Sequence, residues 1–476
     1  MKFYKSKHLQ INKDKKGNSY AYHSLFGNFC KLTDSQLVLL NKIEQGENIN
    51  ETEEDIIFLL DKNFIYKTEN VNEYELIQPI IKKYQEELQT GESITKLLLY
   101  VTGNCMLKCS YCYLNDAEAM AATTNTLNCS RNNMTWEVAK NAIDKFHDIV
   151  YKFKQKKVHI RFMGGEPFMN FPIIKKSIEY INETFSDIEV VFHCNTNGVA
   201  LTDEMIKFWI EEGNQGLHST DIEISIDGPK NCHDEFRVFS NGKGTFDKCI
   251  ETLKKFIEFG CPKERIDIAC TLTKMNYNRL RELIDMASEI GLSMIEINTL
   301  IFDSPMDILQ TPEKRADALI DARIYASKKG IRVTGKWFKL FERLNAPVLN
   351  YCGRIGQQFS IDLDGNVFPC TGYFKNLGHI NNWENFIKDD LYMELGSRVV
   401  GKLKECENCP IECVCAGGCP ASAESSYGSF YAREDKECEF RKLMVKKLIY
   451  HIDEIKNIGV DEVDSSYVPT LNKYKK

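Results

Sequence analysis

Short apolar runs and amphipathic stretches alternate along the middle of the chain, from residue 95 to about residue 335. The amphipathic stretches have helical periodicity, for example Trp136–Val150 behind a Thr135 cap. The apolar runs predict strands at Leu97–Val101, Val158–Met163, Glu189–Cys194, Asp221–Ile226, Ile266–Leu272 and Met294–Leu300. Alternation of this kind is typical of a parallel sheet, and six such units predict an α/β fold with a partial (β/α)6 barrel.

The first 90 residues follow another pattern, which predicts a small separate module. Asn18–Lys31 contains two aromatic runs typical of a short hairpin, and the capping box Thr33-Asp-Ser-Gln36 predicts a helix directly after it. A second helix is expected from Thr52. Strands are then expected at Phe64–Tyr66 and Tyr74–Leu76, with a connecting helix near Ile80–Leu88. This order predicts a winged-helix-like unit, whose simplest role is packing or dimerisation.

The chain after residue 340 is rich in cysteines and turn-forming residues, and it ends in an amphipathic stretch, Arg441–Ile455, that predicts a helix. Residues 406–419 have no apolar periodicity of their own, so bound metal would have to stabilise this segment. We therefore divide the chain into three predicted domains, at residues 1–90, 91–340 and 341–476.

Composition narrows the class of protein. The 476 residues carry a net charge of −7 without a long basic run, which argues against nucleic acid as a partner. The N-terminal residues have no signal-peptide core, and no apolar run is long enough to span a membrane. We therefore expect a cytoplasmic protein. In that compartment, 18 cysteines argue against a disulfide framework and for bound metal.

Three cysteines follow the first predicted strand as Cys105-x3-Cys109-x2-Cys112. Zinc prefers four nitrogen or sulfur ligands, and the nearest fourth candidate is Cys129, so an iron–sulfur cluster with one open iron fits better. Turns rich in glycine and polar residues follow the next three strands, at Gly164–Pro167, Asn195–Gly198 and Ser225–Pro229. Because the C-terminal ends of barrel strands meet at one rim, these turns predict a shared ligand site.

With these residues the sequence resembles the radical S-adenosylmethionine (SAM) superfamily, through the three-cysteine motif with Tyr111 and through Gly164-Gly165-Glu166-Pro167. The resemblance implies a TIM-like partial barrel and a [4Fe–4S] cluster on Cys105, Cys109 and Cys112 whose fourth iron binds SAM. It also implies reductive cleavage of SAM to methionine and a 5′-deoxyadenosyl radical.

The same resemblance implies five residues that contact SAM. They are Gly165 for the methionine amino group, Ser225 and Arg237 for the methionyl and carboxylate end, and Tyr111 and Leu300 for adenine. A glycine allows close backbone approach, and an arginine suits a carboxylate. A surface arginine on a loop remains the alternative for Arg237.

The C-terminal cysteines resemble the SPASM domain of peptide-modifying radical enzymes. The pattern is Cys352-x12-Gly365-x4-Cys370, a gap, and then Cys406-x2-Cys409-x5-Cys415-x3-Cys419-x18-Cys438. The resemblance implies auxiliary cluster I on Cys352, Cys370 and Cys419, and auxiliary cluster II on Cys406, Cys409, Cys415 and Cys438, giving three [4Fe–4S] clusters in all. Cys413 is a free thiol or a fourth ligand of cluster I. A zinc site within residues 406–419 stays open as an alternative, but it leaves Cys352 and Cys370 unexplained.

Two departures from sulfatase-maturing relatives narrow the predicted activity. No cysteine lies between Cys352 and Cys370, and Thr371 stands where those enzymes place a catalytic aspartate. Three thiolates on cluster I would leave one iron for a substrate thiolate, which suits a maturase that forms cysteine thioether crosslinks in a precursor peptide. The resemblance further implies that residues 1–90 bind a leader peptide as an added strand. An external flavodoxin or ferredoxin would supply electrons.

Other interpretations stay open. Within the same class they are carbon–carbon crosslinking, epimerisation and formylglycine formation in a sulfatase. Outside it they are an iron–sulfur electron carrier or scaffold, and a zinc-stabilised binding protein. Seven cysteines in the SPASM order beside a barrel rim argue against both non-enzymatic interpretations. The remaining cysteines are expected in the core: Cys30, Cys129, Cys194, Cys232, Cys249, Cys261 and Cys270.

Overall fold

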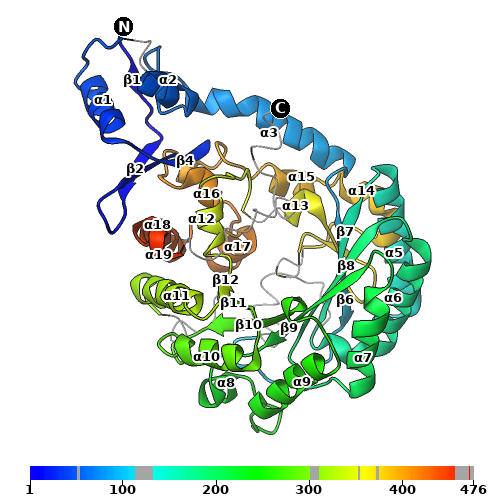
Figure 1. Cartoon of the computed structure of the whole chain (residues 1–476). Coiled ribbons are helices and arrows are strands. Elements are labelled where there is room, and N and C mark those ends of the chain that lie inside the picture. Colours follow the sequence, from blue (N-terminus) through cyan, green and yellow to red (C-terminus); the bar gives the residue numbers. More distant parts are fainter. Residues whose placement is uncertain are drawn as a thin grey trace.

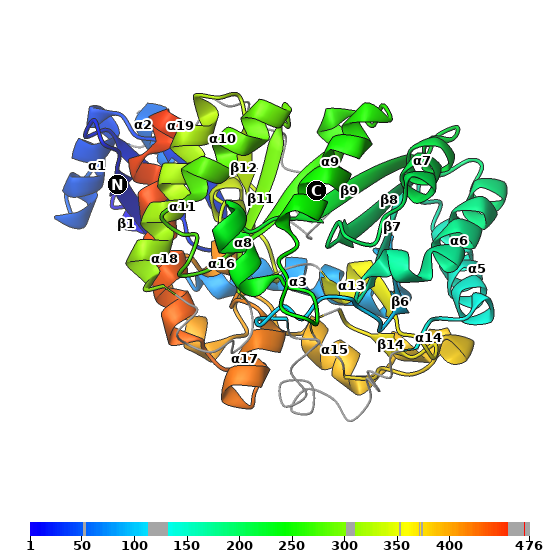
Figure 2. The same cartoon turned by 90° about the horizontal axis from the view of Figure 1, so that it is seen from below.

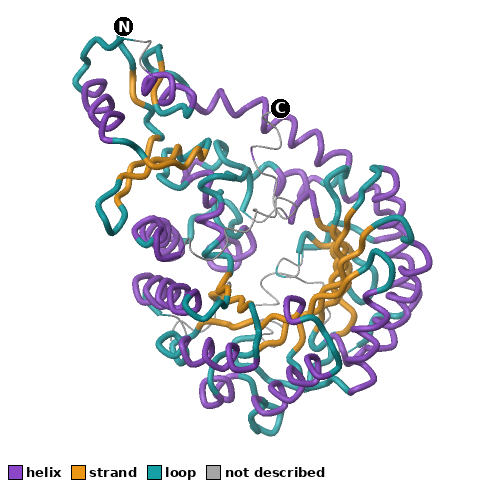
Figure 3. Tube along the Cα trace, viewed as in Figure 1, coloured by secondary structure: helices purple, strands orange, loops and turns teal. Residues whose placement is uncertain are grey.

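The structure, a computed structural model, describes residues 1–50, 54–112, 132–300, 310–351, 354–370, 372, 375–455 and 471. Its centre is a sheet with the strand order β12-β11-β10-β9-β8-β7-β6-β13-β14, curved into an arc (Figures 1 and 3). The parallel strands are β6 (Lys96–Thr102), β7 (Lys157–Gly164), β8 (Glu189–Thr196), β9 (Ser219–Ser225), β10 (Ile266–Leu272), β11 (Met294–Thr299), β12 (Arg332–Thr334) and β13 (Gln358–Ile361). β14 (Val367–Phe368) pairs antiparallel with β13.

All six predicted strands are present and lie side by side in chain order, which confirms the α/β partial-barrel fold. Helices cover the outer face of the arc (Figure 1): α5 (Trp136–Lys152), α6 (Phe171–Thr184), α7 (Asp203–Glu211), α9 (Phe246–Glu258), α10 (Leu280–Ile290) and α11 (Pro312–Ser327). Thr135 caps α5 as predicted, since its hydroxyl accepts a hydrogen bond from the Val138 N–H. The short strands β12, β13 and β14 extend the predicted sheet at both edges.

The two faces of the sheet differ in chemistry. Outward-facing side chains such as Ile160, Phe162 and Phe192 are fully buried against the helices. Most of the alternate, inward-facing positions of β7 to β9 are polar, among them His159, Arg161, His193, Asn195, Asp221 and Glu223. Parallel strands covered on both faces are usually apolar throughout, so this polar inner wall indicates a face that receives ligands.

The N-terminal module contains β1 (Tyr4–Lys5), β2 (Leu9–Lys13), β3 (Ser19–His23), β4 (Gly27–Lys31), α1 (Asp34–Glu44), α2 (Glu54–Asp61), β5 (Ile65–Tyr66) and α3 (Glu73–Thr90). β3 and β4 pair antiparallel, which confirms the hairpin, and Thr33 and Gln36 form the predicted capping box before α1. β2 completes a three-stranded sheet with them. The predicted pairing of residues 64–66 with residues 74–76 is wrong, because β5 pairs with β1 instead.

Tyr74–Leu76 instead lies in the first turn of α3. The helix predicted near Ile80–Leu88 is a later part of the same helix. Four side chains at helical spacing form one buried stripe along α3: Ile77, Ile81, Tyr84 and Leu88. This stripe outweighs the strand propensity of a single tyrosine. Leu88 packs so closely on the C-terminal region that a Cβ on Gly396 would lie 2.4 Å from its Cδ1. The domain boundaries at residues 90 and 340 stay a prediction.

The C-terminal region lies across the open side of the arc (Figure 1). Its helices are α12 (Lys339–Glu342), α13 (Arg354–Gln357), α14 (Trp383–Phe386), α15 (Asp390–Gly396), α16 (Glu412–Cys415), α17 (Pro420–Tyr427), α18 (Asp435–Tyr450) and α19 (Ile452–Ile455). The predicted amphipathic helix is present as α18 and α19, and it begins earlier than expected. α18 packs between α11 of the barrel and β2 of the module (Figure 2). The 3₁₀ turns are η1 (Pro167–Asn170), η2 (Glu212–Asn214), η3 (Lys263–Arg265), η5 (Ile380–Asn382) and η6 (Lys404–Cys406). Among the described residues, no helix is long and apolar enough to cross a membrane.

Candidate active site at the sheet rim

The segment after β6 carries Cys105, Cys109 and Cys112 at the C-terminal edge of the sheet. Its backbone pairs with the segment that follows α8 (Lys230–Phe236). The Lys108 N–H donates to the Val238 carbonyl at 2.8 Å, and Leu107 forms a β-bridge with Phe239. This pairing holds the cysteine segment beside the segment that contains Arg237.

The three thiols lie close enough to influence one another's ionisation. Burial raises the pKa of Cys109 to about 12; the Arg237 guanidinium opposes this shift, and Cys112, Asp227 and Cys105 add to it. Burial also raises the pKa of Cys105, and the Cys112 thiol contributes to that rise. Thiolates therefore form here with the help of added positive charge, which an iron–sulfur cluster supplies, so the donor set fits a [4Fe–4S] cluster.

No three His, Cys, Asp or Glu side chains in the described part of the chain converge on a position for a single metal ion. This does not conflict with a cluster, because the cysteines of a [4Fe–4S] cluster each bind a different iron and need not converge on one point.

Gly165 lies directly beneath the cysteine segment. Its N–H donates to the Thr102 carbonyl at 2.8 Å, and the next N–H, of Glu166, donates to the Asn104 carbonyl at 2.7 Å. A Cβ at position 165 would lie only 2.3 Å from the Asn104 oxygen. A glycine is therefore required for the backbone that leads into Cys105 to pack on the end of β7.

Glu166 connects the ends of β7 and β8 beneath the rim. Its fully buried carboxylate accepts hydrogen bonds from the Thr196 hydroxyl and the Asn197 N–H, both at 2.7 Å. Burial raises the pKa of Glu166 to about 7, although these hydrogen bonds oppose the rise. The Asn197 side chain in turn donates to the Cys105 sulfur at 3.7 Å. Glu166 thus fixes the residue that contacts the first cysteine, a role that the sequence pattern did not reveal.

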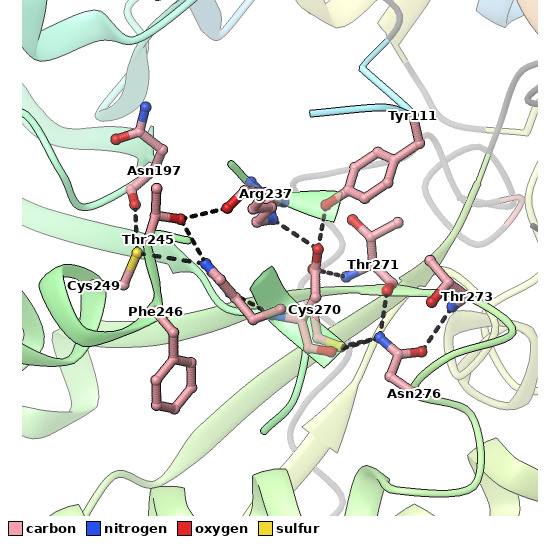
Figure 4. A network of polar contacts seen from close by, with 12 residues as sticks. Tyr111, Asn197, Arg237, Thr245, Phe246, Cys249, Cys270, Thr271, Thr273 and Asn276 are labelled. Carbon is pink, nitrogen blue, oxygen red and sulfur yellow. Dashed lines mark hydrogen bonds and ion pairs between the residues drawn. The ribbon is translucent and has the colours of Figure 1, made fainter. Parts of the chain in front are cut away.

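Asp227, just after β9, is the centre of a buried polar network. Figure 4 labels its partners Tyr111, Arg237 and Thr271. Its Oδ2 accepts hydrogen bonds from the Tyr111 hydroxyl and from Arg237 Nε, the latter at 2.7 Å. Its Oδ1 accepts from the Thr271 N–H at 2.8 Å. The guanidinium carbon of Arg237 lies 5.4 Å from the centre of the Tyr111 ring. One carboxylate therefore sets the orientation of two predicted SAM contacts.

A second branch of this network fixes the backbone of Arg237 (Figure 4). The Asp227 N–H donates to His233 Nδ1 at 3.3 Å, so the ring proton is on Nε2, which lies 3.0 Å from the Thr245 hydroxyl. That hydroxyl donates to the Arg237 carbonyl at 2.8 Å. Burial lowers the pKa of His233 to about 4, so the imidazole stays neutral at physiological pH.

Two nitrogens of the Arg237 guanidinium remain available to a ligand. Its side chain is 12% exposed, and Nε is engaged by Asp227, whereas Nη1 and Nη2 have no acceptor among the described residues. Burial lowers the pKa of Arg237, but Asp227, Tyr111 and the Cys109 thiol outweigh burial and raise it well above its usual value. The residue is therefore a fixed cation with two unused donors, which is what a carboxylate ligand requires.

The structure brings four of the five predicted SAM contacts to this rim: Gly165, Ser225 at the end of β9, Arg237 and Tyr111. The fifth, Leu300, lies just beyond β11, in a hollow also lined by Asn298, Lys336, Tyr351, Cys419 and Arg441. This hollow separates the end of β11 from the cysteine-rich region.

The described cysteines of the C-terminal region fall into two groups. The first contains Cys406, Cys409, Cys415 and Cys438. Burial raises the pKa of Cys406 to about 12, and the other three thiols of this group add to the rise. Burial and then the Cys415 thiol raise the pKa of Cys438 to about 11. These four thiols therefore lie close enough to influence one another's ionisation, and their donor set fits a four-ligand cluster.

The second group contains Cys370 and Cys419, which pack on one small apolar cluster with Leu395, Ala421 and Phe430. Their predicted partner Cys352 lies outside the described residues, as do Thr371 and Cys129. Cys413 faces elsewhere: its sulfur lies 3.8 Å from the His23 carbonyl of the N-terminal module.

The other described cysteines do not join these groups. As predicted, five of them are buried in the core: Cys194, Cys232, Cys249, Cys261 and Cys270. Cys30 is only partly buried.

Comparison with known proteins identifies the central domain. Residues 99–287 match the Radical SAM superfamily. The radical SAM cyclopropyl synthase TigE of Paramaledivibacter caminithermalis is 24% identical, over 96% of this chain and 98% of that protein. The cysteine-type anaerobic sulfatase-maturating enzyme of Clostridium novyi is 23% identical, over 71% of this chain and 90% of that protein.

A solved structure shares the fold over nearly the whole chain. SuiB of Streptococcus suis, bound to its precursor peptide SuiA, has a TM-score of 0.52 and 17% identity, and covers 92% of this chain and 99% of its own. The matched residues 99–287 contain the cysteine segment, the glycine rim and the Asp227 network. Residues 99–287, the central part of the chain, therefore form a radical SAM domain.

Proposed function

We propose that this protein is a radical SAM maturase that modifies a precursor peptide. Cys105, Cys109 and Cys112 would hold the [4Fe–4S] cluster, and the rim residues Gly165, Ser225, Arg237 and Tyr111 would hold SAM, with Leu300 at the edge of the site. When bound, these groups supply an electron and a 5′-deoxyadenosyl radical that removes a hydrogen atom from a substrate carbon. The observation that carries the proposal is the buried Arg237, which has two unused donors and lies beside Cys109.

The chain's own residues would bind and orient the cofactor. Nη1 and Nη2 of Arg237 would take the SAM carboxylate as a bidentate pair, while Asp227 keeps Nε and therefore the plane of the guanidinium fixed. The hydroxyl of Tyr111 donates to Asp227 and the Arg237 guanidinium lies over one face of the ring, so the other face of Tyr111 would contact the ligand. Gly165 would keep the backbone that leads into Cys105 packed on the end of β7, beside the cofactor.

The proposal of a peptide substrate rests on the relatives and on the N-terminal module. SuiB was solved with a precursor peptide, and the chain matches it over most of its length. Residues 1–90 would bind the leader at an edge of the β2–β3–β4 sheet. This module contacts the cysteine-rich region directly: Tyr74 donates to Glu412 at 2.8 Å, and the Cys413 sulfur contacts the His23 carbonyl.

Thioether formation is our proposal for the bond that is made. Cys370 and Cys419 share one apolar cluster and would hold auxiliary cluster I together with Cys352. Three protein thiolates on that cluster would leave one iron for a substrate sulfur. Overall, a substrate C–H and a substrate S–H would become one C–S bond: the 5′-deoxyadenosyl radical would take the hydrogen atom from carbon, the thiol would lose its proton, and auxiliary cluster I would supply the acceptor for the remaining electron. A flavodoxin or ferredoxin would be the external electron donor.

Formation of a carbon–carbon ring is a second candidate. It is favoured by the likeness to the cyclopropyl synthase TigE, which extends over 96% of the chain and includes the N-terminal module. Both reactions remove two hydrogen atoms from the peptide, so mass alone does not separate them.

Anaerobic purification tests the first step. The protein should be brown and contain about 12 irons per chain if three clusters are bound. With dithionite and SAM it should release 5′-deoxyadenosine. Alanine at Cys105, Cys109 or Cys112 should abolish this release, whereas the control Cys261→Ala, in the core of the barrel, should retain it. Colourless protein that contains zinc, or release that survives the three substitutions, would refute the proposal.

The product distinguishes the two bonds. Short reading frames beside the gene supply candidate precursor peptides, and a modified peptide should be lighter by two hydrogens. Iodoacetamide alkylates a free cysteine but not a thioether, so a product that resists alkylation supports thioether formation. A lighter product that is still fully alkylated supports ring formation. Hydrogen exchange on the full-length protein should show leader-dependent protection of β2 or β4; no protection would refute the assignment of residues 1–90.

A further inference from the structure

We propose that Arg441 is a positioning residue for auxiliary cluster II, and that its buried guanidinium raises the reduction potential of the cluster bound by Cys406, Cys409, Cys415 and Cys438. The inference rests on the proposed function, because it requires that these four thiols hold a cluster. It adds a specific residue and a measurable property to that site.

Arg441 lies at the junction of the two cysteine groups. It follows Cys438 by three residues on α18, so both side chains lie on the same face of the helix. The residue is 7% exposed. A Cβ on Gly418 would lie 2.2 Å from Arg441 Nη1. The guanidinium therefore packs directly on the backbone between Cys415, of the first group, and Cys419, of the second.

Tyr351 completes this junction. The guanidinium carbon of Arg441 lies 5.2 Å from the centre of the Tyr351 ring. Burial raises the pKa of Tyr351, Arg441 opposes the rise, and the thiols of Cys419 and Cys415 add to it. The Tyr351 ring therefore lies close to one cysteine from each group, Cys419 and Cys415. The Arg441 guanidinium, which stacks on this ring, lies between the same two groups.

The carboxylates around Arg441 leave its charge only partly compensated. Its Nη2 lies 3.5 Å from Glu434 and 3.8 Å from Glu437, longer than the 2.7–2.9 Å typical of a charge-assisted hydrogen bond. Glu437 is also shared, since it forms a closer ion pair with Arg315 at 2.5 Å. Burial lowers the pKa of Arg441, and the Cys415 thiol is the main factor that raises it, ahead of Tyr351 and both carboxylates.

A fixed buried cation beside such a cluster has a predictable effect. Four thiolates give the site negative charge, and reduction adds one more electron. The attraction to a nearby guanidinium grows when that electron is added, and it is strong because little water screens a buried site. The reduction potential of the cluster therefore rises. Net charge is one of the properties by which proteins set the potentials of iron–sulfur clusters.

The test uses the full-length protein with its auxiliary clusters, purified anaerobically in a background in which Cys105, Cys109 and Cys112 are replaced by alanine, so that only the auxiliary clusters contribute. Iron content is measured first, and the potential of cluster II is then followed by redox titration with electron paramagnetic resonance. Arg441→Met should lower the potential by at least a tenfold change in the one-electron equilibrium, about 59 mV. Arg441→Lys should retain most of the wild-type value.

Two further variants separate charge from structure. Arg315→Met is the matched control, because Arg315 is also buried, stacks on Phe440 and pairs with Glu437, but belongs to α11. It should lower the potential by less than Arg441→Met does, because Arg315 acts on the Arg441 charge only through the shared Glu437. Glu434→Gln removes a negative charge beside Arg441 and should raise the potential, the opposite sign to Arg441→Met.

The outcomes are distinct. Unchanged potentials in Arg441→Met and Glu434→Gln with full iron content would overturn the inference, as would an equal shift in Arg315→Met. If Arg441→Met loses cluster II, the Glu434→Gln variant decides the question: a higher potential supports the inference, and an unchanged or lower potential overturns it. Wild-type protein without auxiliary iron would instead refute the proposed function.

Discussion

Replacing Asp227 with asparagine tests the network that orients Tyr111 and Arg237 while keeping the size of the side chain. Asparagine still offers one oxygen to the Thr271 N–H. In place of Oδ2 it has an amide nitrogen, which accepts neither the Tyr111 hydroxyl nor Arg237 Nε. The substitution therefore removes the counter-charge of Arg237 and leaves two donors without an acceptor.

The expected cost follows from burial. Asp227 is fully buried and the Arg237 side chain is only 12% exposed, so the guanidinium keeps its charge in a site with little water. Removing one partner of a buried ion pair costs about 3–5 kcal/mol, since the other charge stays buried without compensation. The pair between Arg281 and Asp321 provides a control, because about half of each side chain is exposed. Asp321→Asn should have little effect, as is usual for surface ion pairs.

The assay is amide hydrogen exchange of β9 and β10, which gives the free energy of local opening for the strands on either side of Asp227. Asp227→Asn should lower that free energy by about 3–5 kcal/mol and Asp321→Asn should not change it. Arg237→Met in the same chain should recover part of the loss, because no uncompensated charge remains. If the two substitutions are additive to within about 0.5 kcal/mol, the two residues are not coupled and the reasoning is wrong.

Three further predictions test other parts of the structure. Burial, and then Glu223, Asp221 and Glu296, raise the pKa of Asp267 to about 8, so the folded state binds a proton that the unfolded state has lost above about pH 4. The free energy of unfolding should therefore fall between about pH 4 and pH 8 by up to about 1.4 kcal/mol per pH unit. Urea unfolding at pH 6 and pH 8 should show a smaller fall for Asp267→Asn than for the wild type, and an equal fall in both proteins would contradict the assignment. Gly165→Ala should displace the backbone before Cys105 and abolish release of 5′-deoxyadenosine. Gly260→Ala should retain this release, because its Cβ has nothing within 4 Å and it adds only the local strain of a left-handed turn (φ +89°). Tyr74→Phe removes a hydroxyl that donates to Glu412 and accepts from the Asn408 N–H. Amides between Cys406 and Cys415 should therefore exchange faster, with a free energy of opening lower by about 1–3 kcal/mol. Equal protection would show that the module does not stabilise this segment.

The strands of the barrel were predictable because each is an apolar run of the right length bounded by turn-forming residues. The register of β10 and β11, with Ile268 opposite Ile295, follows from burial of the same face. The error at Tyr74–Leu76 has a different origin, since one tyrosine and one leucine suit a strand or a helix equally well. The stripe from Ile77 to Leu88, which depends on contacts with the C-terminal region, decides the outcome.

The candidate site shows the same division between local and distant information. The spacing of Cys105, Cys109 and Cys112 is local, so it can be read from the sequence. The pairing of Tyr111 with Asp227 joins residues 116 positions apart, and no motif records it. Arg441 likewise contacts Tyr351 and Gly418 from a helix far along the chain. Buried hubs of this kind become visible only when the fold brings their partners together.

Two parts of the molecule use a common arrangement of charge. At the rim, Asp227 holds Arg237 from behind, and the guanidinium acts on Cys109. In the C-terminal region, Glu434 lies on one side of Arg441, and the guanidinium acts on Cys438. In both places the carboxylate is engaged by protein donors, whereas the cation lies next to a cysteine group. In each place the positive charge lies toward the thiolates and the carboxylate lies behind it. This arrangement lowers the energy of a negatively charged cluster. It also orients the rim for a carboxylate ligand, so the same electrostatic design would serve the cluster and the cofactor that contacts it.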